Sequence, residues 1–451
     1  MKITFIGAGS VVFTRNLVKD ILAFPALRNE TRICLEDIDP HRIELIKQFI
    51  HNVKEHNADE LQNVKFEFTL DQKEAIKDAK YVVCSFMVGG MKAYGNDVKI
   101  PHRYGVTQVV GDTLGPGGIF RFLRSVPVYE SILKDVEELG NKDAVLLNYT
   151  NPMAMNTYYC NKISSVFTIG LCHGVQHTSN QLRSWLGVEK ENFSYECFGI
   201  NHMAWFTKLQ MRNTPNSEFV NAYPTLLQKL DENRRLGAKE NIRIDMMKAT
   251  GYYMTESSGH LSEYLPYYLK RWDLRVKYGK IFSRNFHSLK QGIDYRNHRL
   301  MTKFINQIFK FILSKPVIIR EQPSDEFCSS IINAMETNEP FRFNGNYLQT
   351  DGSHITNLLK ECCVETPVIA DNKGFHPESG FELPPVCQAL NLSNILVQNT
   401  AVKGALQRDK ELIYHAALLD PNAASSCSPA EIRKMVDKMF EANKEYLTYF
   451  E

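Results

Sequence analysis

The residues best suited to chemistry stand where predicted strands end. Cys172 directly follows a strand-like run at 167–171, and His202 directly precedes another at 203–211. A thiolate and an imidazole together suit a divalent ion of borderline softness and leave positions open for substrate oxygens. Two protein ligands are few, so such an ion would bind weakly and depend on the substrate. Either residue taken alone is more often structural.

A glycine-rich turn, Gly7-Ala8-Gly9-Ser10, separates a predicted strand from a predicted helix. Glycines allow a tight turn and let backbone N–H groups approach a pyrophosphate at the helix N-terminus. The third glycine of the usual fingerprint is replaced by Val12. The pair Glu36-Asp37 closes the second predicted strand, where Asp37 would accept ribose hydroxyls and favour NAD over NADP. The order of strand, glycine-rich turn, helix, second strand and acid predicts a dinucleotide-binding site. The alternative is an ordinary turn between a strand and a helix in which the glycines are incidental.

Two asparagines, Asn148 and Asn151, follow the predicted strand at 144–147. Open α/β sheets bind ligands beyond the carboxyl ends of their strands, so both amides are expected to face the cofactor or a sugar hydroxyl. Asn151 precedes a proline, however, and Asn-Pro commonly starts a helix. The residues alone leave turn chemistry as an equal alternative.

Two further segments combine acids with unusual composition. Asp112 stands at the start of a loop at 111–118 that is rich in glycine, and it is a candidate acid unless the loop is a plain surface turn. The segment 255–268 is dense in titratable and aromatic side chains, including Tyr264. A tyrosine cluster of this kind more often belongs to a core or an interface.

The elements that must position these residues alternate between strands and helices over the first 200 residues. Such alternation predicts a doubly wound, parallel, Rossmann-type sheet like that of lactate and malate dehydrogenases. The predicted strands are 3–6, 33–35, 64–68, 81–85, 144–147 and 167–171, and the first predicted helices are 11–23 and 40–56.

The pattern changes after about residue 200. Residues 203–211 alternate like an antiparallel strand, and further strands are predicted near 341–349 and 363–370. We therefore predict two domains, a Rossmann-like NAD-binding domain at 1–200 and a mixed α+β catalytic domain at 201–451. Long amphipathic stretches are predicted at roughly 222–250, 284–314, 324–336, 386–418 and 429–448.

Composition narrows the class of protein. The chain has 451 residues, of which 43% are hydrophobic and 23% charged, as in ordinary globular proteins, and its formal net charge is +2. No basic run favours nucleic acid or an anionic membrane, and no apolar stretch approaches the ~20 residues of a membrane span. The ten scattered cysteines do not form a disulfide scaffold. We expect a cytoplasmic protein with reduced thiols.

Taken together, these motifs resemble those of the NAD-dependent family 4 glycoside hydrolases, most closely their α-galactosidase (melibiase) branch. The resemblance runs nearly end to end and includes Gly199-Ile200-Asn201-His202, Thr255-Glu256-Ser257-Ser258, Asn333-Ala334-Met335 and Val364-Glu365. It implies cleavage of an α-glycoside by oxidation at C3, deprotonation at C2 and elimination, with NAD⁺ and a divalent ion, Mn²⁺ first among them. This family departs from the usual mechanism with two carboxylates.

The resemblance also implies roles for single residues. Cys172 and His202 match the family's metal ligands, and Tyr264 matches the tyrosine that acts as base at C2. Asp112 is the better candidate for the acid, because His173 stands where the phospho-sugar branch has an aspartate. His173 is a further candidate catalytic residue. A small glycoside would be the substrate of a homodimer or homotetramer.

Two positions depart from the α-galactosidase pattern, Gly174 and Gly259, where that branch has serine and glutamate. Gly111 resembles the uronic-acid-specific members instead. The overall resemblance and the histidine after Cys172 nevertheless make an unphosphorylated α-galactoside the first expectation, with an α-galacturonide or α-glucuronide second and an α-glucoside third. Two other classes stay open, namely a 2-hydroxy acid dehydrogenase and an NAD-binding regulatory protein whose sugar site has decayed.

Overall fold

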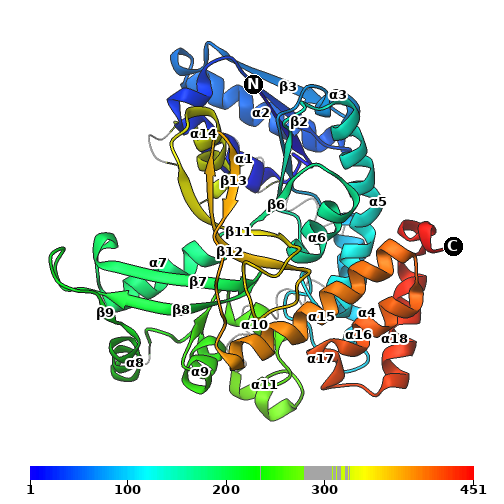
Figure 1. Ribbon diagram of the computed structural model, residues 1–451. Helices are drawn as coiled ribbons and strands as arrows, with labels where there is room; N and C mark the ends of the chain where they lie inside the picture. The colour runs from blue at the N-terminus through cyan, green and yellow to red at the C-terminus, as the bar shows by residue number, and fades with distance from the viewer. Residues whose placement is uncertain (234, 279–306, 308–310, 312–315, 320–322, 325) are drawn as a thin grey trace.

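The structure of the chain is a computed structural model that describes residues 1–233, 235–278, 307, 311, 316–319, 323–324 and 326–451 (Figure 1). The amphipathic stretch predicted at 284–314 falls outside the described residues except for two positions. The other predicted elements lie within the described part of the chain, apart from the single positions 234 and 325.

Parallel strands form one half of a long sheet, in the order β3-β2-β1-β4-β5-β6. Successive residues of these strands face opposite sides: Ile3 and Phe5 lie in one apolar cluster and Ile6 in another. Helices cover both faces, as a parallel sheet requires, which confirms the predicted doubly wound half. The strands are β1 (Lys2–Ile6), β2 (Thr31–Glu36), β3 (Val64–Thr69), β4 (Tyr81–Cys84), β5 (Val145–Asn148) and β6 (Thr168–Leu171).

The two helices predicted in this half, at 11–23 and 40–56, have the predicted bounds. Asp39 caps the second of them, accepting a hydrogen bond from the backbone N–H of His41. The loop predicted at 111–118 is shorter than expected, since a helix already begins at Gly115. The helices are α1 (Val11–Ala23), α2 (Pro40–His56), α3 (Gln72–Ile76), α4 (Gly90–His102), α5 (Gly115–Leu139), α6 (Met153–Ile163) and α7 (Gly174–Leu186).

The sheet continues without a break into an antiparallel half, in the order β6-β11-β12-β7-β8-β10. The strand β7 (Phe193–Ile200) was not predicted, and it pairs with β8 (Met203–Met211) across a tight turn. The division of the chain into domains at residue 200 stays a prediction. The other strands are β9 (Val220–Asn221), β10 (Tyr253–Met254), β11 (Phe341–Gln349), β12 (Cys362–Asp371) and β13 (Gly374–Pro377).

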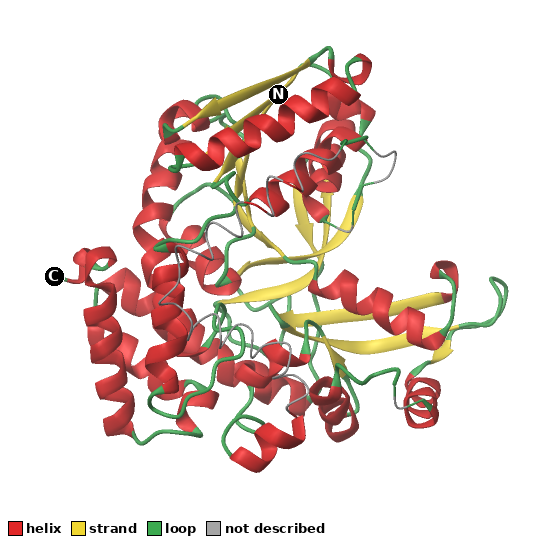
Figure 2. Ribbon diagram, turned by 180° about the vertical axis from the view of Figure 1, so that it is seen from behind, coloured by secondary structure: helices red, strands yellow, loops and turns green. Residues whose placement is uncertain are grey.

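Among the remaining helices, α16, α17 and α18 pack against α5, and helices surround the C-terminus of the chain (Figure 2). The stretch predicted at 386–418 forms two helices, because Arg408 takes a left-handed conformation between them. The stretch at 222–250 also divides into two. These helices are α8 (Tyr223–Glu232), α9 (Asn241–Thr250), α10 (Ser258–Tyr264), α11 (Trp272–Tyr278), α14 (Phe327–Thr337), α15 (Pro385–Gln407), α16 (Lys410–Leu419), α17 (Pro421–Ala424) and α18 (Pro429–Asn443).

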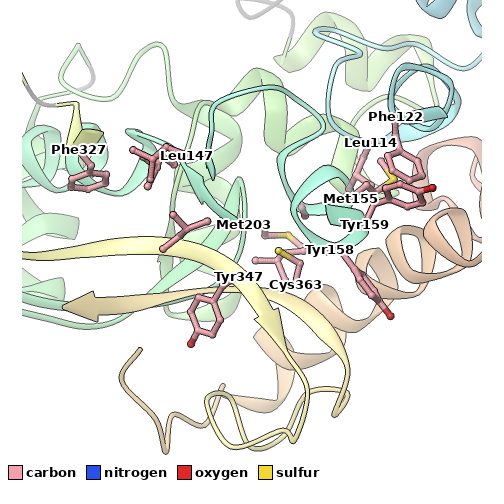
Figure 3. Close-up of a cluster of buried hydrophobic side chains, with 14 of the residues drawn as sticks. Leu114, Phe122, Leu147, Met155, Tyr158, Tyr159, Met203, Phe327, Tyr347 and Cys363 are labelled. Carbon is pink, nitrogen blue, oxygen red and sulfur yellow. The ribbon is translucent and has the colours of Figure 1, made fainter. Parts of the chain in front are cut away.

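One apolar core joins the parallel and antiparallel halves. Leu147 of β5, Met203 of β8 and Cys363 of β12 belong to the same buried cluster (Figure 3). Burial of this shared surface couples the two halves through the hydrophobic effect. No helix among the described residues combines the length and the apolar character needed to cross a bilayer.

Candidate active site

The predicted site residues gather at the carboxyl edge of the parallel strands. β1, β5 and β6 end at Ile6, Asn148 and Leu171, and β4 lies between the first two. Cys172 directly follows β6, and His202 reaches it from the turn between β7 and β8. This is the edge at which open α/β sheets bind their ligands.

The turn after β1 wraps around the end of β2. Gly7 has a φ of 81°, and its N–H donates to the carbonyl oxygen of Glu36 at 3.1 Å. The N–H of Gly9 donates to the carboxylate of Asp37 at 2.8 Å. A Cβ atom on Gly9 would lie 2.5 Å from that carboxylate oxygen, so only glycine lets the backbone come this close. The turn and the acid therefore form one unit.

The two acids at the end of β2 have different surroundings. Glu36 is only 3% exposed, and burial raises its pKa to about 7. Asp37 is less buried and accepts hydrogen bonds from the N–H groups of Gly9 and Asp39. Ser10 stands beside them as the N-cap of α1. Asp37 is thus the acid that a bound ligand can reach.

Three side chains converge deeper in the site: Cys172, His202 and Glu256. Their ligating atoms all lie within 4.8 Å of one another. Oε1 of Glu256 lies 3.7 Å from Sγ of Cys172 and 3.8 Å from Nε2 of His202. His202 and Glu256 have φ angles of 63° and 67°. Such strain costs a non-glycine residue about 1–3 kcal/mol and is concentrated at functional sites.

The electrostatics of these three residues follow from burial. Burial lowers the pKa of His202 to about 4, which leaves the neutral imidazole that binds metals. Burial raises the pKa of the Cys172 thiol well above its ordinary value, and the Glu256 carboxylate adds to that shift. Burial works against ionisation of Glu256 as well, but the imidazoles of His202 and His260 lower its pKa to about 2.

Asp112 lies on the same side of the site as these three side chains and is paired with His260. Its Oδ1 atom is 3.6 Å from Nε2 of His260, and its Oδ2 atom accepts a hydrogen bond from Asn151 at 3.1 Å. Burial opposes the charges on both members of the pair. The imidazolium nevertheless lowers the pKa of Asp112 far below its usual range, and the carboxylates raise the pKa of His260 to about 9. The proton of the pair therefore resides on the imidazole at neutral pH.

The segment 255–264 organises this side of the site. It carries Glu256, His260 and Tyr264, and its Glu263 accepts hydrogen bonds from the backbone N–H groups of Val110 and Gly111. That contact fixes the loop bearing Asp112. Burial raises the pKa of Glu263 to about 7. One short segment thus supplies site residues and also holds the opposite loop in place.

Tyr264 is fully buried in the same region, with its ring centroid 6.5 Å from that of His202. Asn394 of α15 donates a hydrogen bond to its carbonyl oxygen at 3.1 Å. Burial raises the pKa of Tyr264 well above its ordinary value, and Asp112 and Glu263 add to the shift. The protein groups alone therefore do not activate this phenol as a base, and a nearby cation would have to do so.

The remaining predicted residues occupy different places. The amide of Asn148 is satisfied inside the protein, where its oxygen accepts hydrogen bonds from Tyr129 at 2.6 Å and from the N–H of Thr150 at 2.9 Å. Asn151 reaches Asp112 instead. His173 is exposed at the start of α7, with Nδ1 3.5 Å from Glu326. The structure thus joins Asn151 to the candidate acid but directs Asn148 away from it.

Sequence reasoning missed the roles of Glu256, His260 and Glu263. One signal was available, because Glu256 and His260 are only four residues apart in the sequence, with Glu256 just before the start of α10. His260 Nδ1 lies 3.4 Å from Glu256 Oε2. No local pattern predicts that Glu263 binds the loop at 110–111, since that contact joins segments far apart in the chain.

Comparison with known proteins finds matches to one protein family along most of the chain. The sequence model described as Family 4 glycosyl hydrolase matches residues 2–188, and the model for the C-terminal domain of that family matches residues 197–423. An alpha-galactosidase of Bacillus subtilis (strain 168) is 38% identical over 99% of each chain. One of Rhizobium meliloti (strain 1021) is 36% identical, covering 100% of this chain and 89% of the relative.

More distant relatives share the fold. An alpha-galacturonidase of Lachnoclostridium phytofermentans is 26% identical over 99% of this chain and 97% of its own. The crystal structure of the putative glucosidase lplD from Bacillus subtilis superposes with a TM-score of 0.78 at 23% identity, covering 97% of this chain and 99% of that one. The 6-phospho-beta glucosidase from Thermotoga maritima, solved with manganese, NAD⁺ and glucose-6-phosphate, gives 0.77 at 21% identity, covering 99% of each chain.

Proposed function

The chain belongs to family 4 of the glycosyl hydrolases, and from this premise we propose that it cleaves an unphosphorylated α-galactoside with the help of NAD⁺ and a divalent ion. Two alpha-galactosidases at 36% and 38% identity over the whole chain support the choice of sugar. The observation that carries the proposal is that Cys172, His202 and Tyr264 lie close together. They lie at the same edge of the sheet as the glycine-rich turn after β1.

The turn after β1 fits a dinucleotide. Its glycines leave no room for side chains, since a Cβ on Gly7 would lie 2.5 Å from the carbonyl oxygen of Ser85. Asp37 keeps a carboxylate within reach of a ribose diol and would repel a 2′-phosphate. Gly7, Gly9, Ser10 and Asp37 would therefore hold NAD⁺. Relatives of this fold were solved with NAD⁺ bound.

The cluster at Cys172 and His202 fits a divalent ion. His202 is 4% exposed, its pKa is lowered, and its Nε2 atom lies 3.8 Å from Oε1 of Glu256. Cys172 presents sulfur to the same space, and coordination by a metal deprotonates a thiol outright. Mn²⁺ is present in the Thermotoga maritima relative. Cys172 and His202 would hold the ion here and keep it close to Tyr264.

When bound, NAD⁺ would take a hydride from C3 of the sugar and later return it, and the ion would stabilise negative charge on the C2 and C3 oxygens. Tyr264 is the group positioned to remove the proton from C2. Asp112 and His260 would deliver a proton to the leaving group, and we assign this step to the pair because they lie 3.6 Å apart. Asn151 orients Asp112 through its amide.

The residue type at position 173 supports an unphosphorylated sugar as the substrate. It replaces the aspartate that the phospho-sugar branch has directly after the metal cysteine, and it lies beside Glu326. We further propose that the enzyme acts in the cytoplasm as a homodimer or homotetramer. The ten cysteines are all free thiols, which suits a reducing compartment, and light scattering on the purified protein would measure the assembly.

A panel of nitrophenyl α-glycosides tests this function. Activity should be highest on the α-galactoside, in the presence of NAD⁺, Mn²⁺ and a thiol reductant. The galacturonide, glucuronide, glucoside and 6-phospho-galactoside serve as comparisons at equal concentration. A preference for a uronide would move the substrate to the acidic sugars. A preference for the 6-phospho-sugar would contradict the proposal.

A further inference from the structure

The carboxylate of Glu256 stands where a third metal ligand would be. Its Oε1 atom is 3.7 Å from the Cys172 sulfur and 3.8 Å from a His202 nitrogen. Ligand atoms bound at about 2.0–2.3 Å to one ion lie roughly 3–4 Å apart, so these separations fit a shared ion. Family resemblance assigned only the cysteine and the histidine to the metal.

The second oxygen of this carboxylate, Oε2, contacts the imidazole of His260. Oε2 of Glu256 lies 3.4 Å from Nδ1 of His260, and that same nitrogen is 3.1 Å from the Ser257 hydroxyl. Carboxylates that bind metals are commonly oriented in this way by hydrogen bonds to the other oxygen. Oε1 is therefore presented toward Cys172 and His202.

Gly174 makes room for this arrangement. A Cβ atom at this position would lie 3.0 Å from Oε1 of Glu256 and 3.4 Å from Sγ of Cys172. The first distance is tighter than ordinary contacts, so a side chain would push the carboxylate away. The N–H of Gly174 also lies 3.4 Å from the same sulfur. A glycine here lets the carboxylate approach the sulfur.

We propose that Glu256 is a third protein ligand, so that Cys172, His202 and Glu256 hold a divalent ion before any sugar binds. The proposal rests on the metal role in the proposed function. Thiolate and carboxylate together balance the charge of a divalent ion, and the carboxylate adds an oxygen ligand of the kind Mn²⁺ prefers. Three protein ligands still leave positions open for two substrate oxygens.

Binding of Mn²⁺ alone to the full-length protein tests this inference without any turnover. Protein stripped with EDTA is titrated with Mn²⁺ in the absence of sugar, and free Mn²⁺ is measured by electron paramagnetic resonance. Glu256→Gln keeps the shape of the side chain and should weaken Mn²⁺ binding by more than the ~10–100-fold effect that is typical of residues outside the ligand set, because a direct ligand is lost. NAD⁺ affinity and the melting temperature, measured on the same samples, should stay unchanged.

Glu326→Gln is the matched control. The Glu326 and Glu256 side chains are similarly buried, at 17% and 14% exposed, but Glu326 faces His173 instead of the cluster. Its Mn²⁺ affinity should equal that of the unmutated protein. If Glu256→Gln also binds Mn²⁺ normally while Cys172→Ser does not, the inference is overturned and the metal role survives. If Cys172→Ser binds normally as well, the metal role itself fails.

Gly174→Ala gives a second test that leaves every ligand in place. The added methyl should displace the carboxylate and weaken Mn²⁺ binding. In a Glu256→Ala background the same substitution should have no further effect, because the side chain it crowds is gone. Equal losses in both backgrounds would mean that Gly174 acts independently of Glu256, which contradicts the proposal.

Discussion

The proposed nucleotide-binding turn at 7–10 and the proposed metal site, the cluster of Cys172, His202 and Glu256, are built in contrasting ways. The turn uses backbone N–H groups at 7–10 and the carboxylates of Glu36 and Asp37 at the adjoining strand end, and these groups bind one another directly. The cluster draws Cys172, His202 and Glu256 from three separate segments, and two of the three have strained backbone. In the first region the polar groups bind one another, whereas the second brings three buried side chains together whose pKa values all differ from their ordinary values.

This contrast implies that substitutions can remove ligand binding in one region without affecting the other. The turn depends on glycine geometry and should keep binding its ligand whatever happens at the cluster. The cluster concentrates desolvated thiol, imidazole and carboxylate, which is costly unless an ion joins them. Each variant below is therefore expected to damage one region and spare the other.

The largest effect is expected at the metal ligands. Cys172→Ser or His202→Ala should abolish glycoside turnover, since loss of a direct ligand exceeds the ~10–100-fold effect typical of outer-shell changes. NAD⁺ binding, followed by fluorescence titration, should be unaffected. Full activity after EDTA treatment of the unmutated enzyme would exclude a metal role. Parallel loss of NAD⁺ binding would show that the two regions are not separable.

Tyr264→Phe should follow, with kcat lower by ~10²–10⁴, the usual effect of removing a positioned base. The ring stays, so the core contacts of this fully buried residue are preserved. NAD⁺ and Mn²⁺ affinities should match those of the unmutated enzyme. Substrates with better leaving groups should not restore the rate, because deprotonation at C2 precedes their departure. An unchanged kcat would move the base to another residue.

Asp37→Ala should weaken NAD⁺ binding by about tenfold to a hundredfold, as expected for loss of hydrogen bonds to a charged group. Discrimination against NADP⁺ should fall at the same time, because the repelling carboxylate is gone. Mn²⁺ binding by the cluster should not change. Equal affinities of the unmutated protein for the two cofactors would show that Asp37 does not set the preference.

The smallest effect concerns stability against pH. The pKa of His260 is raised to about 9, so its pairing with Asp112 stabilises the fold fully below about pH 6.5 and progressively less as pH rises through 9. Between pH 7 and 10, the free energy of unfolding of the unmutated, metal-free protein should fall by on the order of 1 kcal/mol more than that of the His260→Asn variant. Denaturant titrations at each pH measure this difference. If the free energy of unfolding depends on pH in the same way in both proteins, the pair of His260 and Asp112 does not contribute to stability.

The fold was largely predictable because its signals are local. The β-branched strand 3–6, the Asp39-Pro40 cap and the alternation at 203–211 each predict an element within one or two residues. The strand at 193–200 was missed, since its pattern gains meaning only once β8 folds back on it. The split at Arg408 was missed as well, because the backbone turns left-handed there at a residue that is not glycine.

The candidate site was predictable only in part, for the same physical reason. Asp37 was found because the fingerprint spans adjacent strands. Asn148 was expected to face a ligand, but its amide bonds inward to Tyr129, which the sequence does not reveal. Glu256 and His260 gain their roles through folding, which brings a distant segment against Cys172 and Asp112.

Isotope exchange at C2 tests the central claim most directly. Galactose released from an α-galactoside in D₂O is examined by proton NMR and mass spectrometry. The account predicts one deuterium at C2, because Tyr264 removes that proton and solvent replaces it. A hydrolase that works through two carboxylates leaves the C2–H bond intact. Product without deuterium at C2 would therefore contradict the elimination mechanism.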